Sequence, residues 1–133
     1  MNVFYSIGIL LYSLGVRTAA LFGNAKAKQW VKGRKDQNQR IKVPELVEGP
    51  TEQWIWFHAA SLGEFEQGRP VIEALKKDFP QYKILLSFFS PSGYEIRKDY
   101  PLADEVLYLP SDTPSHATQW VQRHHFVAAF FIK

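Results

Sequence analysis

The fold is decided by Trp54-Ile-Trp-Phe-His-Ala-Ala-Ser-Leu-Gly-Glu-Phe-Glu-Gln-Gly-Arg-Pro70. Its first six residues form a short, aromatic-rich apolar run, which predicts a buried strand. The turn Ser61-Leu-Gly-Glu64 then leads into an amphipathic helical pattern at 64–78. Open α/β sheets bind ligands where strand ends face helix starts, so this turn is the predicted ligand edge. A carboxylate there could take a proton from a substrate hydroxyl, which makes Glu64 the candidate catalytic base.

Strand and helix patterns alternate from this stretch to the last residue. Predicted strands are 54–59, 83–89, 105–109 and 126–132, and predicted helices are 64–78, 90–98 and 112–122. The strands are almost continuously apolar, which is typical of a parallel sheet covered by helices on both faces. The sequence therefore predicts an α/β fold, although periodicity does not give the order of the strands in the sheet.

Composition limits the class of protein. A chain of 133 residues with 46% apolar and 15% aromatic content predicts one folded domain, and the absence of Cys excludes disulfides, thiolate metal sites and cysteine nucleophiles. Residues 1–50 hold eight Lys/Arg against three Asp/Glu, for a charge of +5, whereas residues 51–133 hold eight against ten, for −2. The basic charge thus lies outside the predicted sheet, which argues against a nucleic-acid-binding domain.

The N-terminal region is apolar and then basic. Residues 4–22 are apolar over nearly a membrane-spanning length, and residues 26–35 follow with Trp30 among five cations. A cleaved signal peptide is disfavoured because no basic segment precedes the apolar run. A short spanning helix remains open, but a helix at an anionic, cytoplasmic membrane surface fits the basic segment better. The alternative is a soluble helix that covers the domain or a partner and has a solvated charged end.

These patterns divide the chain into three parts. Residues 1–36 are predicted to be a membrane-associated helix with a basic tail, and residues 53–133 the α/β domain. Residues 37–52 between them contain Pro44, Gly49 and Pro50 without a sustained period, so a linker is predicted there.

The residues at the predicted ligand edge also have structural interpretations. Ser61 and Glu64 match a capping box, in which Ser61 caps the helix and Glu64 reaches back to the Ser61 amide. That role is compatible with catalysis, because the helix dipole favours an ionised carboxylate in the first turn. Ser90-Pro-Ser-Gly93 follows the second strand at the same edge, where Ser90 is a predicted cap and the free amides and hydroxyls could hold an anion or a sugar.

The remaining polar residues give weaker signals. His58 and Ser61 suggest a Ser–His pair, but neither a nucleophile elbow nor an orienting acid accompanies them, so a hydrogen-bonded structural histidine is favoured. His116, His124 and His125 lack zinc-site spacing, and His124-His125 is predicted to be a solvated turn. The sequence has neither a dinucleotide fingerprint nor a P-loop, and we expect no metal and no cofactor.

Three segments resemble the N-terminal domain of 3-deoxy-D-manno-octulosonic acid (Kdo) transferases. They are the residues from His58 to Pro70, Ser87-Phe-Phe-Ser-Pro-Ser-Gly-Tyr-Glu95, and Tyr108-Leu-Pro-Ser-Asp-Thr-Pro114. The apolar-then-basic N-terminus is also similar to that family's membrane-associated helix, so the resemblance covers nearly the whole chain. It implies the N-terminal, Rossmann-like half of a two-domain GT-B glycosyltransferase.

The resemblance also implies a reaction and its participants. The lipid A precursor would be the acceptor, CMP-Kdo the donor, and the cytoplasmic face of the bacterial inner membrane the location. Glu64 matches the family's catalytic base, which would deprotonate an acceptor hydroxyl that attacks the anomeric carbon of Kdo with inversion. The acceptor side would be lined by Ser61, Gly63, Ser90, Ser92 and Gly93.

The sequence departs from the family in lacking the donor-binding half. We therefore expect the 133 residues alone not to transfer Kdo. Two other interpretations stay open: a non-catalytic α/β adaptor at a membrane surface, and half of a GT-B enzyme that uses another nucleotide sugar.

Overall fold

The computed structural model describes residues 3–40 and 52–133. The helices and strands are α1 (Val3–Leu21), α2 (Ala25–Arg40), β1 (Gln53–Ala59), α3 (Leu62–Asp78), β2 (Lys83–Phe88), α4 (Pro91–Arg97), β3 (Glu105–Tyr108), α5 (Pro114–Arg123) and β4 (His125–Ile132). All the predicted strands and helices of the α/β part are present, and their ends lie within about two residues of the expected ones, as is usual for helix and strand boundaries.

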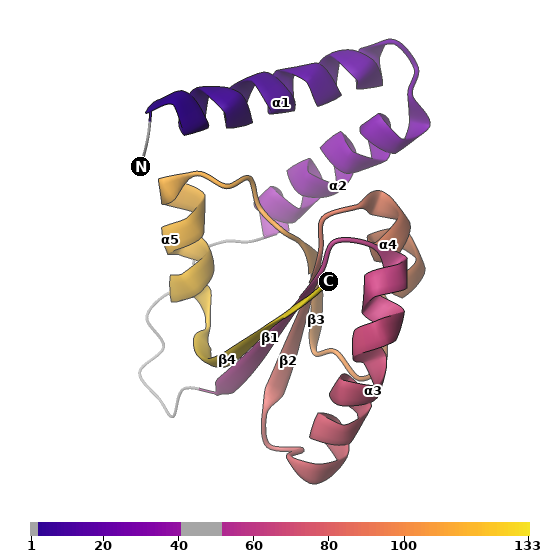
Figure 1. Ribbon diagram of the computed structural model, residues 1–133, viewed down its shortest axis with the longest axis vertical. Helices are drawn as coiled ribbons and strands as arrows, with labels where there is room; N and C mark the ends of the chain where they lie inside the picture. The colour runs from indigo at the N-terminus through magenta and orange to yellow at the C-terminus, as the bar shows by residue number, and fades with distance from the viewer. Residues whose placement is uncertain (1–2, 41–51) are drawn as a thin grey trace.

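The four strands form one parallel sheet in the order β3-β2-β1-β4. Helices α3 and α4 lie on one face of the sheet and α5 on the other (Figure 1). The chain moves outward from β1 through β2 to β3, and then returns across the sheet to β4 on the far side of β1. Because parallel crossovers share one hand, this reversal requires a helix on the opposite face. The predicted α/β fold with helices on both faces is therefore confirmed.

Each face of the sheet has its own hydrophobic core. Alternate residues of β1, namely Ile55, Phe57 and Ala59, pack under α3 against Phe65 and Ile72. The residues between them face α5, where Trp54 and Leu85 pack against Trp120. Burial on both faces explains why the strands read as continuous apolar runs rather than as an alternating pattern.

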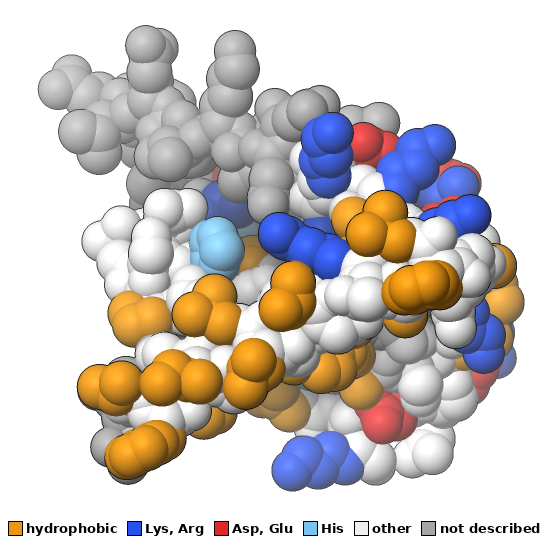
Figure 2. Space-filling view, turned by 90° about the horizontal axis from the view of Figure 1, so that it is seen from above, with side chains coloured by type: hydrophobic (Ala, Val, Ile, Leu, Met, Phe, Trp, Pro, Cys, Tyr) orange, Lys and Arg blue, Asp and Glu red, His pale blue; other side chains and the backbone are white. Residues whose placement is uncertain are grey.

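Helices α1 and α2 form a hairpin above the sheet (Figure 1). They are joined at Gly23, which has the left-handed φ of 95° that glycine adopts without strain. Helix α1 has no buried residue and is long and apolar enough to cross a membrane by length and composition. Its hydrophobic side chains gather in a row in the view from above (Figure 2), and Phe4, for example, is 84% exposed. A predicted apolar helix is therefore present, while its membrane association stays a prediction.

The predicted linker was wrong at its start, because α2 continues to Arg40 and residues 37–40 are helical. Residues 41–51 lie outside the described part of the chain, and the division into domains stays a prediction. The sequence pattern failed here because α2 has few apolar residues, so its helical period is weak.

Helix α2 is held against the sheet by close contacts with Tyr108, the last residue of β3. A Cβ added to Gly33 would clash with the Tyr108 ring, so glycine is required for this approach. The buried Gln37 side chain bonds both backbone groups of Tyr108: the Tyr108 amide donates to Oε1 at 2.6 Å and Nε2 donates to the Tyr108 carbonyl at 2.8 Å. The basic segment is consequently divided between surfaces: Lys26, Lys28, Lys32 and Lys35 are exposed, whereas Arg34 is buried against the domain.

Candidate active site

The loops after β1 and β2 meet at the carboxyl edge of the sheet. Strands β1 and β2 are in register from Trp54 and Lys83 to Ala59 and Phe88, so they end side by side. The Ser90 amide then donates to the Ala60 carbonyl at 2.9 Å and ties the two loops together. Strands β2 and β3 are added on one side of β1 and β4 on the other, so the carboxyl end of β1, which leads into α3, lies at the topological switch point of the sheet, where α/β proteins bind ligands.

Ser61 and Glu64 form a capping arrangement at the start of α3. The Glu64 amide donates to Ser61 Oγ at 3.4 Å, and the Ala60 amide donates to Glu64 Oε2 at 2.5 Å. The prediction that Glu64 would bond the Ser61 amide was wrong by one residue. The donor is the Ala60 amide, one residue before the N-cap Ser61, rather than the N-cap amide of a standard capping box.

The Glu64 carboxylate keeps capacity for a further partner. The side chain is half-buried, only its Oε2 atom has a hydrogen bond, and no cation pairs with it among the described residues. It lies in the first turn of α3, where the helix dipole stabilises a negative charge. The second carboxylate oxygen thus has no hydrogen-bond partner among the described residues.

The other predicted acceptor residues lie around Glu64, each with its own environment. The space above Gly63 is open, since an added Cβ would meet nothing within 4 Å. The Ser90 and Ser92 hydroxyls bond each other at 2.7 Å, and Ser90 also caps α4. Gly93 is buried against Phe88 and a Cβ there would clash with the ring, so packing accounts for this glycine. Contact of these residues with an acceptor stays a prediction.

His58 lies on β1 close to Glu64, but its partner is Ser87 rather than Ser61. The distance from His58 Nδ1 to Ser87 Oγ is 2.9 Å, and the Trp56 indole donates to the same hydroxyl at 2.8 Å. Burial lowers the pKa of His58 below its usual value, and a hydrogen bond with the Ser87 backbone and the Glu64 charge offset this only in part. His58 is thus hydrogen-bonded as expected, and cross-strand register, not proximity in sequence, selects the serine.

The predicted solvated turn at His124 and His125 was wrong, because His125 is the exposed first residue of β4 and His124 is packed against its neighbours. This histidine stacks on Trp54 with ring centroids 4.0 Å apart, and its Nε2 lies 3.0 Å from Glu105 Oε2. Burial alone would raise the pKa of Glu105, but the His124 hydrogen bond and the Arg123 charge outweigh it and lower the pKa overall. The His124–Glu105 contact lies at the junction of α5 and β4, at the end of the sheet opposite to Glu64.

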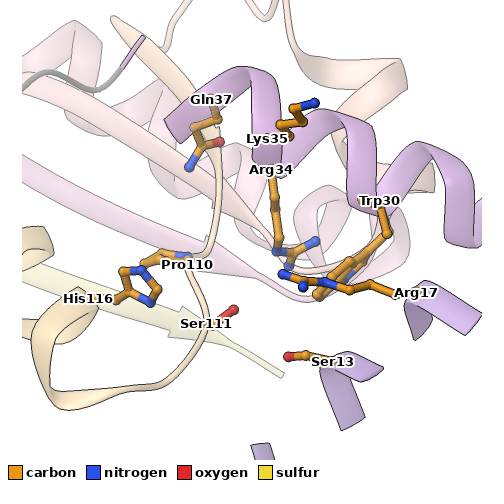
Figure 3. Close-up of a pocket in the computed structure, with 10 residues that line it drawn as sticks. Ser13, Arg17, Trp30, Arg34, Lys35, Gln37, Pro110, Ser111 and His116 are labelled. Atoms are coloured by element: carbon orange, nitrogen blue, oxygen red, sulfur yellow. The ribbon is translucent and has the colours of Figure 1, made fainter. Parts of the chain in front are cut away.

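A cavity of about 590 Å³ lies away from these residues, under the α1–α2 hairpin (Figure 3). We call it the hairpin cavity. It is lined by Ser13, Arg17, Trp30, Val31, Arg34, Lys35, Gln37, Pro110, Ser111 and His116. None of the predicted site residues lines it. The sequence does not reveal this cavity, because its residues come from three separate segments, and its one signal is the cluster of cations that we interpreted as facing a membrane surface.

The fold and its edge define an α/β protein whose candidate ligand site lies at the carboxyl ends of its parallel strands. Comparison with known proteins then identifies the family. The sequence profile described as 3-deoxy-D-manno-octulosonic-acid transferase (kdotransferase) matches residues 31–133. The chain therefore belongs to the Kdo transferase family, and the match begins within α2, one of the elements that line the hairpin cavity.

Curated relatives are similar over the same region. The 3-deoxy-D-manno-octulosonic acid transferase of Haemophilus influenzae is 39% identical over 67 residues, which is 49% of this chain and 16% of the relative. The transferase of Aquifex aeolicus is 38% identical over 61 residues, 45% of this chain and 16% of the relative. The transferase of Chlamydia muridarum is 34% identical over 75 residues, which is 54% of this chain and 17% of the relative. The matched regions thus span about a sixth of the length of these relatives.

Proposed function

We propose that this chain is the acceptor-binding half of a glycosyltransferase that moves Kdo from CMP-Kdo to a lipid A precursor. Membership of the Kdo transferase family supports the reaction. The observation that carries the proposal is the position of Glu64, whose carboxylate lies at the switch point of the sheet with one oxygen unpartnered by described residues. The donor would bind mainly to a second domain, and no metal or cofactor is proposed.

In the proposed mechanism Glu64 acts as the general base. Its carboxylate takes the proton of an acceptor hydroxyl, the hydroxyl oxygen forms a bond to the anomeric carbon of Kdo, and the bond from that carbon to CMP breaks. Attack from the side opposite the leaving CMP inverts the anomeric centre. The hydrogen bond from the Ala60 amide would fix the carboxylate in position, so that little ordering is needed when the acceptor arrives.

We also propose that the enzyme works at the cytoplasmic face of the bacterial inner membrane. The exposed apolar surface of α1 would enter the lipid, and Lys26, Lys28 and Lys32 of α2 would lie at the anionic headgroups. This arrangement would bring the sheet edge to a membrane-bound acceptor.

The catalytic proposal is tested in the full-length protein with Glu64→Gln. The amide oxygen of glutamine still accepts the Ala60 hydrogen bond but is not a base, so kcat should fall about 10²- to 10⁴-fold with CMP-Kdo and a lipid A precursor. Glu73→Gln is the matched control, because Glu73 lies on the same helix in an exposed ion pair with Arg69. Turnover by E64Q within about twofold of E73Q would contradict the base assignment.

A second candidate is a non-catalytic adaptor, with which the capping geometry is equally compatible, because the same contacts would be present if Glu64 only capped the start of α3. This candidate predicts that E64Q and E73Q behave alike in the assay above. Replacing CMP-Kdo by another nucleotide sugar in the same assay tests the remaining possibility, a GT-B enzyme with a different donor.

A further inference from the structure

The hairpin cavity carries an unbalanced positive charge. Arg17 from α1 and Arg34 and Lys35 from α2 line it, and no acidic side chain of residues 3–40 or 52–133 does. None of these three cations forms an ion pair with another described residue. In Figure 3 the Arg17 and Arg34 side chains converge beside Trp30. Cations held together in a concave site without counter-charges favour an anionic ligand.

Arg34 is fixed in the wall of the cavity rather than lying free on the surface. It is only 8% exposed, its Nε donates to the Leu109 carbonyl at 3.2 Å, and its Nη2 donates to the Phe89 carbonyl at 3.2 Å. Its guanidinium also stacks on Trp30, 3.9 Å from the ring centroid. Burial lowers the pKa of Arg34 to about 10, so the group is still charged at neutral pH.

Two donors in this wall are left unsatisfied. Arg34 Nη1 and the Trp30 indole nitrogen are both buried and have no hydrogen-bond partner among the described residues. A buried charge with an unused N–H is costly unless a ligand completes its hydrogen bonds. Two residues that line the cavity therefore hold N–H donors without a hydrogen-bond partner among the described residues.

The opposite wall adds small polar groups. Ser111 precedes α5, and His116 lies in the first turn of α5, where its Nδ1 is 2.9 Å from Thr113 Oγ1. Ser13 faces them from α1, and α1 is tied to the same loop by the Tyr5 hydroxyl, which donates to the Asp112 carboxylate. Hydroxyls and a helix start next to cations are the surroundings in which tetrahedral oxyanions are bound.

We propose that the hairpin cavity binds a phosphoryl group. Arg34 and Arg17 would hold its oxygens by charge-assisted hydrogen bonds, Lys35 would add charge, and Ser13, Ser111 and His116 would complete the shell. Three cations suit a doubly charged phosphomonoester better than a singly charged phosphodiester. The cavity is larger than a phosphoryl group needs, so the remainder of the ligand would extend out of it.

One loop connects the cavity to the carboxyl edge of the sheet beside Glu64, which we call the Glu64 edge. Phe89, whose carbonyl Arg34 bonds, immediately precedes Ser90, whose amide bonds the Ala60 carbonyl beside Glu64. A phosphorylated sugar could thus be held by its phosphoryl group in the cavity while a hydroxyl reaches Glu64. This assignment of the phosphoryl group to the acceptor rests on the proposed function, whereas the anion site itself does not.

The test compares two double variants of the 133-residue chain with equal net charge. R17Q/K35Q removes two cations of the cavity, and K28Q/K32Q removes two exposed cations of the hairpin outside it. Titration with inorganic phosphate, followed by calorimetry, should give an affinity about tenfold weaker for R17Q/K35Q than for K28Q/K32Q, because charge-assisted bonds are lost only in the first. Equal affinities of the two variants would overturn the proposal.

A second measurement does not depend on the folding of a variant. The indole N–H resonance of Trp30, assigned with Trp30→Phe, should shift as phosphate is added to the wild-type chain, because the indole lines the cavity. An unchanged resonance at saturating phosphate would overturn the site. Glu64→Gln should leave the phosphate affinity unchanged, so failure of the catalytic proposal and failure of the cavity proposal are distinguishable.

Two further arms identify the source of the phosphoryl group. One uses phosphatidylcholine vesicles with phosphatidic acid or with phosphatidylglycerol, and the other uses glucosamine 1-phosphate in solution. If R17Q/K35Q loses binding only to the phosphatidic acid vesicles, the result supports the cavity with a lipid headgroup as its ligand. If R17Q/K35Q loses binding only to glucosamine 1-phosphate, the result supports the cavity with a phosphorylated sugar as its ligand. Retention of both by R17Q/K35Q would overturn the proposal.

Discussion

The Glu64 edge and the hairpin cavity differ in how their polar groups are satisfied. At the edge, Ala60, Ser61 and Glu64 are close in sequence and bond one another. In the cavity, Arg17 and Arg34 come from different helices, and buried donors remain without described partners. Residues near in sequence can satisfy one another's hydrogen bonds. The motif that is easiest to recognise in the sequence, Ser61 to Glu64, therefore has fewer unsatisfied donors and acceptors than the cavity. Unmet needs arise where the fold brings distant segments together.

Gly33→Ala should give the largest stability effect and separate the two regions. The added Cβ clashes with the buried Tyr108 ring, so α2 must move and the free energy of unfolding should fall by about 1–3 kcal/mol. Phosphate affinity should fall with it, because α2 carries Arg34 and Lys35, while Glu64 is untouched. Urea unfolding and phosphate titration measure the two quantities.

Gly8→Ala is the matched control for Gly33→Ala. An added Cβ at Gly8 meets nothing within 4 Å, so alanine should stabilise α1 by up to about 1 kcal/mol through its better helix propensity. If the two alanine variants lost stability equally, the close approach of α2 to Tyr108 would not be what holds the hairpin in place.

Glu64→Ala should have an intermediate effect and sharpen the capping side of the comparison. Alanine removes the acceptor of the Ala60 amide and should cost about 0.5–2 kcal/mol of unfolding free energy, whereas Glu64→Gln keeps an acceptor and should cost less. Denaturant unfolding of both variants gives the difference. Equal stability of the alanine and glutamine variants would show that the carboxylate contributes nothing to the cap.

His58→Gln should give the smallest effect, which appears only in the pH dependence. The pKa of His58 is lowered in the folded state, so the unfolded chain binds more protons as pH falls below about 6.5 and the wild type loses stability. Glutamine does not titrate, so the variant should lose less stability between pH 7 and 5. The difference should be at most about 1 kcal/mol, because the ring is only half-buried, and parallel slopes in denaturant unfolding would contradict it.

The α/β fold was predictable because its signals are local. Apolar strands, the caps at Ser61 and Ser90, and proline at the start of α4 each act within a few residues. The strand order was not predictable, because it depends on which sheet edge β4 joins. The extension of α2 to Arg40 was missed because its few apolar contacts with the domain leave no period in the sequence.

The candidate site was predictable only where the chain supplies neighbouring residues. Glu64, Ser61, Ser90 and Ser92 do lie near one edge because parallel strands end together. His58 is hydrogen-bonded as predicted, but its partner could not be named from the sequence, because Ser87 is 29 residues away and is brought alongside by strand register. The hairpin cavity could not be predicted, since the docking of α2 on Tyr108 decides which cations turn inward.

Gln37 has a consequence for self-association. An outer strand offers spare backbone groups to which a strand of another molecule can add, a route to aggregation that natural sheets block in various ways. Strand β3 is such an outer strand, and the carboxamide of Gln37 occupies both backbone groups of its last residue. The Gln37 side chain thus takes the place of a neighbouring strand at Tyr108 and keeps a strand of another copy from bonding the sheet at that residue.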